Sequence, residues 1–169
     1  MTLRNWKTWA FTLTPLAVLG FGLFVAYVPG KEPNFDDFMK AHEAFNMEQY
    51  RLAAETFEPL AISGDQRAQT YMTDIEAFGL GRPINREWAK DWAARSDATN
   101  SRGGKECIVG IHWANGHFGT KNTEESAYWI SYADLLRGYS FCLDSFQGKR
   151  LPDDLREEIE DAIRIFSIK

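Results

Sequence analysis

Apolar residues recur every three to four positions through most of the chain after Pro33, which is the spacing of one buried face of an α-helix. No segment shows a convincing strand pattern. The stripes comprise Phe35, Phe38, Ala41, His42 and Phe45; Tyr50, Ala53, Ala54, Phe57, Leu60 and Ala61; Ala68, Tyr71, Met72, Ile75 and Phe78; Trp88, Ala89, Trp92 and Ala93; and Leu155, Ile159, Ala162, Ile163 and Phe166. We therefore expect an all-α domain.

Residues with strong preferences for helix ends separate these stripes. Gly64 is placed to end one predicted helix, and Asp65 is placed to cap the next. Pro152 suits the first turn of the last helix, where Asp153 and Asp154 lie at the positive end of the helix dipole. The sequence thus predicts short helices joined by short turns.

The stretch Gly79-Leu80-Gly81 has two interpretations, a phosphate-binding loop or a turn between helices. A dinucleotide-binding loop needs a preceding strand and a third glycine, whereas here a helix is predicted first and Ile84 occupies the third position. Pro83 also removes a backbone N–H. A second glycine-rich stretch, residues 102–107, lacks the upstream glycine and the Ser or Thr of a P-loop. We interpret Gly79–Gly81 as a turn and expect no cofactor.

Residues 8–30 contain no charged side chain. These 23 residues are long enough to cross a bilayer core of roughly 30 Å as a helix. A cleaved signal peptide is the alternative, but the run is long and lacks a small-x-small site before the charged residues that follow. The predicted division is residues 1–30, a tail and transmembrane helix, and residues 31–169, a folded domain. The anchor residues singled out are Trp9 and Tyr27 at the headgroup level, Pro15, and Gly20 and Gly22, which permit close approach of another helix.

Charge narrows the classes of partner. The chain has a net charge of −5; residues 1–30 contain two basic and no acidic residues, so the remainder has 17 basic and 24 acidic residues and a net charge of −7. This balance argues against nucleic acid and against flat binding to anionic lipid, since both require clustered Lys and Arg. Basic residues nearly balance on the two sides of residues 8–30, and we expect the N-terminus inside and the domain exported.

A period of 37 residues runs through the domain. It relates Gly79 to Gly116, Met72 to Val109, Gln69 to Glu106, and Trp92 to Trp129 and then Phe166. A fixed period of this length is typical of a helix-pair solenoid, in which each unit buries its apolar face against its neighbours.

The stretches "LAISGDQRAQ" (60–69) and "GLGRPINREWAKDW" (79–92) resemble the Sel1-like repeat, a bacterial relative of the tetratricopeptide repeat. In that family Gly-Asp opens the first helix, Gly-x-Gly forms the turn, and Ala-x-x-Trp packs the second helix. The resemblance implies a right-handed α-solenoid. It implies an opening half-unit at 34–62, repeat 1 at 64–100, repeat 2 at 101–137 and a degenerate terminal unit at 138–169.

Three positions depart from the family pattern. Thr73 stands where the family has Gly, Glu76 stands where it has an aromatic residue, and Lys105 stands where it has Ala. The second unit restores Gly110 and Trp113 at the first two of these positions and widens its turn to "GHFG", residues 116–119.

Candidates for chemistry are few. His112 and His117 are five residues apart with Gly116 between them and no intervening acid, unlike a helical zinc pair, so we expect no metal. Cys107 and Cys142 lie in the first helices of successive units, and two interpretations stay open: a disulfide, which an exported domain permits, or two buried small residues without a role. The acidic run at 153–161 is interpreted as a hydrated helix face. We expect no catalytic residue and no enzyme.

The sequence and the resemblance together predict a single-pass protein of the inner (cytoplasmic) membrane of a bacterium, with a cytoplasmic N-terminus and a periplasmic interaction scaffold. We expect an accessory subunit, adaptor or assembly factor of an integral membrane complex, with no nucleic acid and no small-molecule substrate. Two alternatives are an envelope signalling regulator with a sensor or inhibitor domain, and a module that binds or hydrolyses cell-wall glycan. The candidate partner contacts are Tyr71, Asp74, Trp88, His112, Asn115, His117 and Tyr128.

Overall fold

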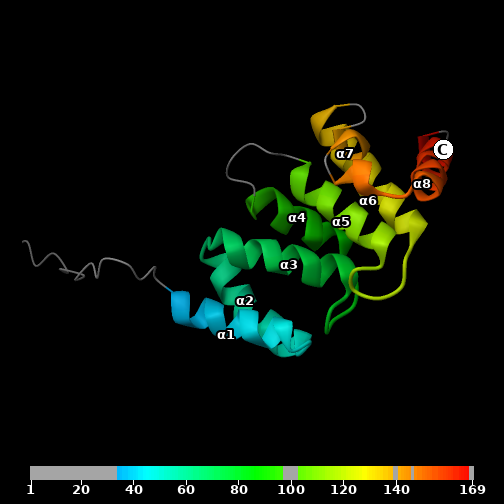
Figure 1. Ribbon diagram of the computed structural model, residues 1–169. Coiled ribbons are helices and arrows are strands. Elements are labelled where there is room, and N and C mark those ends of the chain that lie inside the picture. Colours follow the sequence, from blue (N-terminus) through cyan, green and yellow to red (C-terminus); the bar gives the residue numbers. More distant parts are fainter. Residues whose placement is uncertain (1–33, 97–102, 139–140, 146, 168–169) are drawn as a thin grey trace, which may run out of the picture. The chain divides into compact units, whose positions relative to one another are not determined.

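The computed structural model describes residues 34–96, 103–138, 141–145 and 147–167. These residues form eight α-helices and one short 3-10 helix, with no strand among them, which confirms the all-α prediction (Figure 1). The elements are α1 (Phe35–Asn46), α2 (Tyr50–Ile62), α3 (Gln66–Phe78), α4 (Arg86–Ser96), α5 (Gly104–Asn115), α6 (Thr123–Arg137), α7 (Phe141–Asp144), η1 (Gly148–Arg150) and α8 (Asp153–Ser167).

Helices that follow one another in the sequence pack against each other. α1 packs on α2, α2 on α3, α3 on α4, α5 on α6, and α6 on α8, and Figure 1 shows this order running from α1 to α8. One apolar cluster joins α1 to α4 and a second joins α5 to α8. A third, smaller cluster of Ala77, Ala89, Val109 and Trp129 links the two. The described residues, which all fall within Glu32–Lys169, form one compact unit.

The 37-residue period is visible in the hydrogen bonds of two turns. Gly79 and Gly116 end α3 and α5 with nearly identical left-handed backbones, at φ +66° and +68°, which glycine adopts without strain. The equivalent backbone bonds, donor first, are Leu80–Ile75 and His117–His112, both 3.0 Å, and Asn85–Glu76 and Asn122–Trp113, 2.9 and 3.1 Å. The domain is therefore helical and repeat-like, and Gly79–Gly81 forms the turn between α3 and α4.

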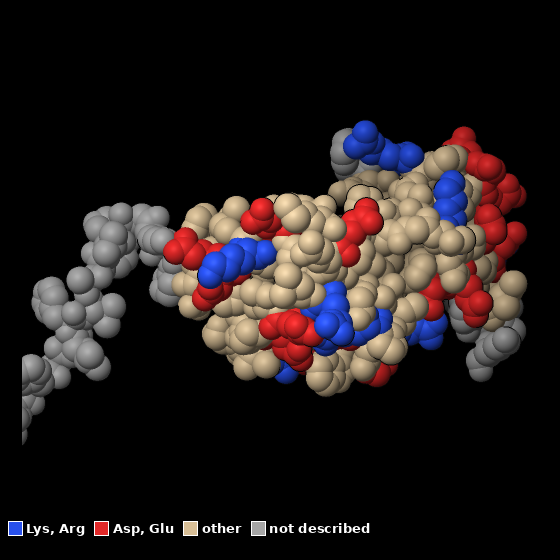
Figure 2. Space-filling model, turned by 90° about the horizontal axis from the view of Figure 1, so that it is seen from below, with Lys and Arg blue, Asp and Glu red and all other residues tan. Residues whose placement is uncertain are grey.

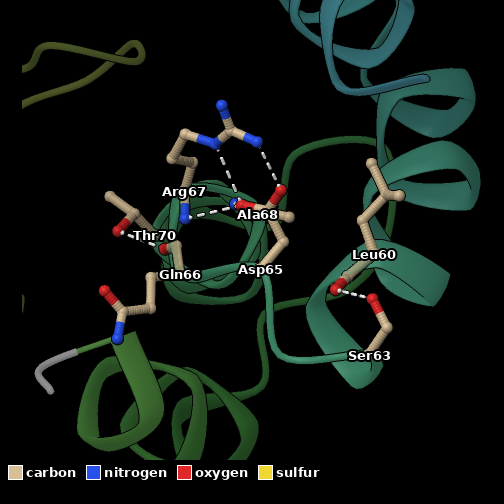
Figure 3. Close-up of polar contacts among 7 residues, drawn as sticks. All are labelled: Leu60, Ser63, Asp65, Gln66, Arg67, Ala68 and Thr70. Atoms are coloured by element: carbon tan, nitrogen blue, oxygen red, sulfur yellow. Dashed lines mark hydrogen bonds and ion pairs between the residues drawn. The ribbon is translucent and has the colours of Figure 1, made fainter. Parts of the chain in front are cut away.

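Asp65 caps α3, as the sequence predicts. Its carboxylate accepts hydrogen bonds from the backbone N–H of Arg67 (3.0 Å) and Ala68 (3.2 Å), and the Arg67 guanidinium donates to it at 2.7 Å (Figure 3). These donors satisfy N–H groups that the first helical turn leaves unpaired. The hydrogen bonds from Arg67 are the main reason that the pKa of Asp65 lies below its usual value.

Thr73 stands where the resemblance predicts glycine, and its packing environment differs from that of Gly110, the equivalent position 37 residues later. A Cβ at Gly110 would lie 2.7 Å from Cγ1 of Ile130, so α5 approaches α6 closely where the second unit has glycine. In the first unit the equivalent positions hold Thr73 and Ala93, both fully or almost fully buried. The larger residue on the first helix is thus accompanied by a smaller one on the second, which preserves core volume.

Glu76 and Lys105, the other two residues that differ from the Sel1-like pattern, both form ion pairs. Glu76 is only 2 % exposed, and the Arg82 guanidinium donates to it at 2.9 Å while also pairing with Glu58 of α2 at 3.3 Å. Burial raises the pKa of Glu76 although Arg82 opposes that effect. Lys105 donates to both carboxylate oxygens of Asp74 at 2.8 Å, which ties α5 to α3. Each unusual charged residue therefore has a partner of opposite charge.

The two ends of the domain differ from its middle. Residues 34–62 form two helices, α1 and α2. At the other end α7 has four residues, and α8 starts directly after Pro152. Cys107 of α5 and Cys142 of α7 are joined by a disulfide, with their Cα atoms 5.3 Å apart. A helix of four residues is not stable by itself, so the disulfide helps to hold α7 in place against α5.

The proposed anchor residues Trp9, Pro15, Gly20, Gly22 and Tyr27 lie outside the described residues. Among the helices that the structure does describe, none has both the length and the apolar character needed to cross a bilayer.

Two glycines with positive φ allow a matched test of the close approach between the α3–α4 turn and α2. A Cβ at Gly81 (φ +72°) would lie 2.5 Å from the backbone N of Arg51, whereas a Cβ at Gly64 (φ +99°) would meet nothing within 4 Å. Both alanine variants incur backbone strain of about 1–2 kcal/mol. We expect Gly81→Ala to lower the free energy of unfolding by at least about 1 kcal/mol more than Gly64→Ala, because only Gly81 adds a clash with backbone. Urea denaturation of both variants measures this, and equal losses would contradict the role given to Gly81.

Candidate functional site

A continuous group of ring-bearing side chains links the first helices of the successive pairs. It comprises Phe45 of α1, Tyr71 and Phe78 of α3, His112 of α5, and His117 and Phe118 of the turn after α5, and it is called here the aromatic surface. Five of these side chains are half-buried and His117 is exposed. Rings that are neither fully buried nor isolated present apolar area to solvent while resting on the core below.

Phe118 is the centre of the aromatic surface. Its ring lies 4.8 Å from Phe78, 4.6 Å from His117, 5.8 Å from His112 and 6.0 Å from Phe45, measured between ring centroids. Phe45 in turn contacts Tyr71 at 4.9 Å in an edge-to-face arrangement, which aromatic pairs favour. A residue from the turn between α5 and α6 therefore connects rings that lie up to about seventy positions away in the sequence.

A buried ion pair lies close to these rings. Asp74 and Lys105 have side chains that are only 11 % and 12 % exposed. Burial raises the pKa of Tyr71, and the charge of Asp74 raises it further. Burial lowers the pKa of His112 to about 4, with Asp74 opposing that effect and His117 and Lys105 adding to it. His112 is consequently neutral at physiological pH and stacks on His117 with ring centroids 4.4 Å apart.

The structure divides the sequence-based contact candidates between two places. Tyr71, His112 and His117 belong to the aromatic surface, and Asp74 is buried beside it in the pair with Lys105. Asn115 is exposed near the end of α5.

Trp88 and Tyr128 lie elsewhere, on α4 and α6. Trp88 is 49 % exposed and lines a shallow pocket with Pro83 and Ile84. Tyr128 is half-buried, with the Arg86 guanidinium 4.7 Å and the Lys90 ammonium 5.3 Å from its ring centroid. The ring of Tyr128 therefore already contacts two cations of its own chain.

Three members of the aromatic surface are not among the contacts that the sequence predicts. Phe45 and Phe78 fit the helical stripes, and periodicity does not separate a half-buried ring from a fully buried one. Phe118 has a local signal: it is an apolar ring between His117 and Gly119, in a turn where no helical face requires it. Large apolar residues in turns are therefore worth noting as surface candidates.

Comparisons with protein-family models, with curated proteins and with solved structures each found no match to this chain. No group of three or more His, Cys, Asp or Glu side chains within the described ranges is arranged to hold a metal ion. Any functional conclusion therefore rests on the geometry of the domain itself.

The depressed pKa of His112 predicts that acid destabilises the domain. Between about pH 6.5, the ordinary value of histidine, and pH 4, the unfolded chain binds a proton at this residue that the folded chain does not. The contribution of His112 to the free energy of unfolding therefore falls by about 2–3 kcal/mol as the pH is lowered from 7 to 4. His112→Phe keeps a ring but does not titrate.

Denaturation curves of the parent protein and His112→Phe across this pH range isolate that contribution from other acid-sensitive groups such as Asp65. We expect the difference in stability between the two proteins to change with pH in favour of His112→Phe at low pH. A difference that stays constant from pH 7 to pH 4 would show that His112 is not protected from protonation.

Proposed function

We propose that this protein is a protein–protein interaction scaffold, and the observation that carries the proposal is the aromatic surface. Aromatic residues are enriched at protein interfaces, since they offer large contact area at a small entropic cost. Here they gather on three successive first helices and one turn, with a buried ion pair beside them. Repeat solenoids present extended surfaces of this kind to partners.

The Sel1-like assignment is part of this proposal. The repeated turn geometry at Gly79 and Gly116, 37 residues apart, supports a tetratricopeptide-like right-handed solenoid. The partners found for Glu76 and Lys105 remove an objection to it, since the departures from the family pattern are compensated locally. Residues 64–100 and 101–137 are then the two repeats.

Membrane attachment is the second part of the proposal. The uncharged run of residues 8–30 is long enough to span a bilayer, and α1 begins at Phe35, five positions after Gly30. The disulfide between Cys107 and Cys142 supports an oxidising compartment, such as the periplasm of a bacterium. A partner within the membrane or at its surface, for which this chain is an accessory subunit, adaptor or assembly factor, fits both features.

The test compares variants inside and outside the aromatic surface. The tagged full-length chain is purified in mild detergent after expression in its native cells, and the bound proteins are quantified. We expect an integral membrane protein at fixed stoichiometry with the parent chain, and its loss with His117→Ala/Phe118→Ala. Trp88→Ala is the control, because it removes an exposed ring outside the aromatic surface.

Thermal unfolding by circular dichroism confirms that each variant is folded. Loss of the partner with Trp88→Ala and retention with the double variant would overturn the assignment of the aromatic surface. Weak capture at variable stoichiometry would instead favour the alternative of an envelope regulator that contacts its partner transiently.

A cell-wall glycan module is less well supported by the geometry. Stacking on a sugar needs an accessible ring face, and the ring of Tyr128 contacts Arg86 and Lys90. Trp88 is accessible, but the nearby carboxylate of Glu76 is buried and paired with Arg82. A converging pair of free carboxylates, as glycoside hydrolysis uses, is not formed by these residues.

A further inference from the structure

Residues of α6, α7 and α8 line a recessed surface that is separate from the aromatic surface. These helices lie at the opposite end of the helix order from α1 (Figure 1). This groove has a volume of about 750 Å³, within the range of sites that hold ligands or peptide side chains. It is called here the terminal groove. Its lining includes Asp134 and Leu135 of α6, Leu143 and Asp144 of α7, and Ile163 of α8.

The terminal groove has an apolar component. Leu135 is 80 % exposed, the largest exposed fraction among the large apolar side chains of the described residues. Leu143 is buried and Ile163 is half-buried, and both pack into the core beneath. A partner side chain placed here would remove the exposed surface of Leu135 from water, which is favourable at about 25 cal/mol per Å².

The charges of the terminal groove are unbalanced. Its two arginines already have partners. Arg156 donates to the carbonyl oxygens of Leu143 (2.6 Å) and Gly148 (3.3 Å) and pairs with Glu160 (3.7 Å), and Arg164 pairs with Asp161. Asp134 accepts a hydrogen bond from the backbone N–H of Cys142 at 2.8 Å, but it forms no ion pair with any residue that the structure describes. Asp144 likewise forms no ion pair with any residue that the structure describes.

Asp134 and Asp144 line the same groove and carry charges of the same sign. Burial raises the pKa of Asp134, and the nearby charge of Asp144 raises it further. A cation placed between them would relieve that repulsion and gain a charge-assisted hydrogen bond. Glu160 and Asp161 of α8 are paired with Arg156 and Arg164, but Asp153, Asp154, Glu157 and Glu158 add exposed carboxylates that form no ion pair with any residue that the structure describes, and Figure 2 shows acidic side chains gathered along this edge.

We propose that the terminal groove binds a cationic amphipathic segment of a partner protein, with an aliphatic or aromatic side chain against Leu135 and an Arg or Lys between Asp134 and Asp144. The disulfide between Cys107 and Cys142 holds α7, one wall of the groove, against α5. The site uses no residue of the aromatic surface, so the two surfaces can be tested separately.

The test selects ligands by chemistry. A displayed library of random 12-residue peptides is bound to the full-length chain in detergent, and each enriched peptide is then measured by fluorescence anisotropy. We expect peptides that carry an apolar residue within four positions of Arg or Lys. Asp134→Asn/Asp144→Asn should weaken them at least about tenfold, because the charge is lost while the amide oxygen can still accept from Cys142. Leu135→Ser, at a largely exposed position, should also weaken binding of these peptides, because it removes the apolar contact and leaves the two carboxylates unchanged.

Asp154→Asn/Glu157→Gln is the matched control, since it removes the same net charge from exposed positions of α8 outside the terminal groove. Its effect should be less than about threefold, as expected for screened surface charges. Enrichment of acidic or uncharged peptides, failure of any peptide to enrich, or equal weakening by the two double variants would overturn the proposal. His117→Ala/Phe118→Ala should leave peptide binding unchanged, so failure at one surface is distinguishable from failure at the other.

Discussion

Replacing Trp129 with alanine is expected to lower the free energy of unfolding by about 3–5 kcal/mol, the usual range for removing a fully buried large side chain. Trp129 is 0 % exposed and belongs to the small cluster with Ala77, Ala89 and Val109 that links the two larger cores. The three other buried members of this cluster have small side chains that cannot expand to fill the cavity, and the larger rings packed against the cluster are only partly buried. Loss of the Trp129 side chain therefore removes packing contacts from both halves of the domain.

Urea unfolding followed by far-ultraviolet circular dichroism measures this loss, and two variants control it. Trp129→Phe should lose less, because it keeps most of the ring volume and because the indole Nε1 of Trp129 has no hydrogen-bond partner among the described residues. Trp88→Ala, at a side chain 49 % exposed, should change stability by less than about 0.5 kcal/mol. Equal losses at Trp129 and Trp88 would show that Trp129 does not link the two cores.

Removing the disulfide between Cys107 and Cys142 is expected to lower the free energy of unfolding by about 3–4 kcal/mol. The bond closes a loop with a sequence separation of 35, and a cross-link of that span restricts the unfolded chain by about this amount in the loop-entropy description. The loss should be felt most at α7, whose four residues are too few for an independent helix. Cys107→Ala/Cys142→Ala is compared with the parent chain in urea, with and without reductant.

The double variant is its own control for the reductant, since its stability should not respond to it. The parent chain should fall to nearly the stability of the variant once reduced. Rapid alkylation of both cysteines in the native, unreduced protein would contradict the bond, and non-reducing mass spectrometry of proteolytic fragments provides the direct check.

Local signals in the sequence were sufficient for five of the eight α-helices among the described residues and for several helix ends. The apolar stripes predict α1 to α4 and α8, and Asp65 caps α3 as expected because capping depends only on residues two or three positions away. The turn at Gly79–Gly81 could also be predicted from the sequence, since glycine tolerates the positive φ that ends α3. The period of 37 residues could be predicted from the sequence as well, because equivalent turns repeat the same residue types.

The surfaces were decided by tertiary packing. Phe118 meets Phe45 from 73 positions away, and Lys105 meets Asp74 from 31 positions away, and no local pattern encodes either pairing. The sequence by itself determined which segments are helical and where they turn, because those choices depend on neighbours within about four residues. Which half-buried rings join into one surface, and which carboxylates remain without a counter-charge in the terminal groove, depends only on how the helices pack, because burial and charge pairing involve residues that are distant in the chain.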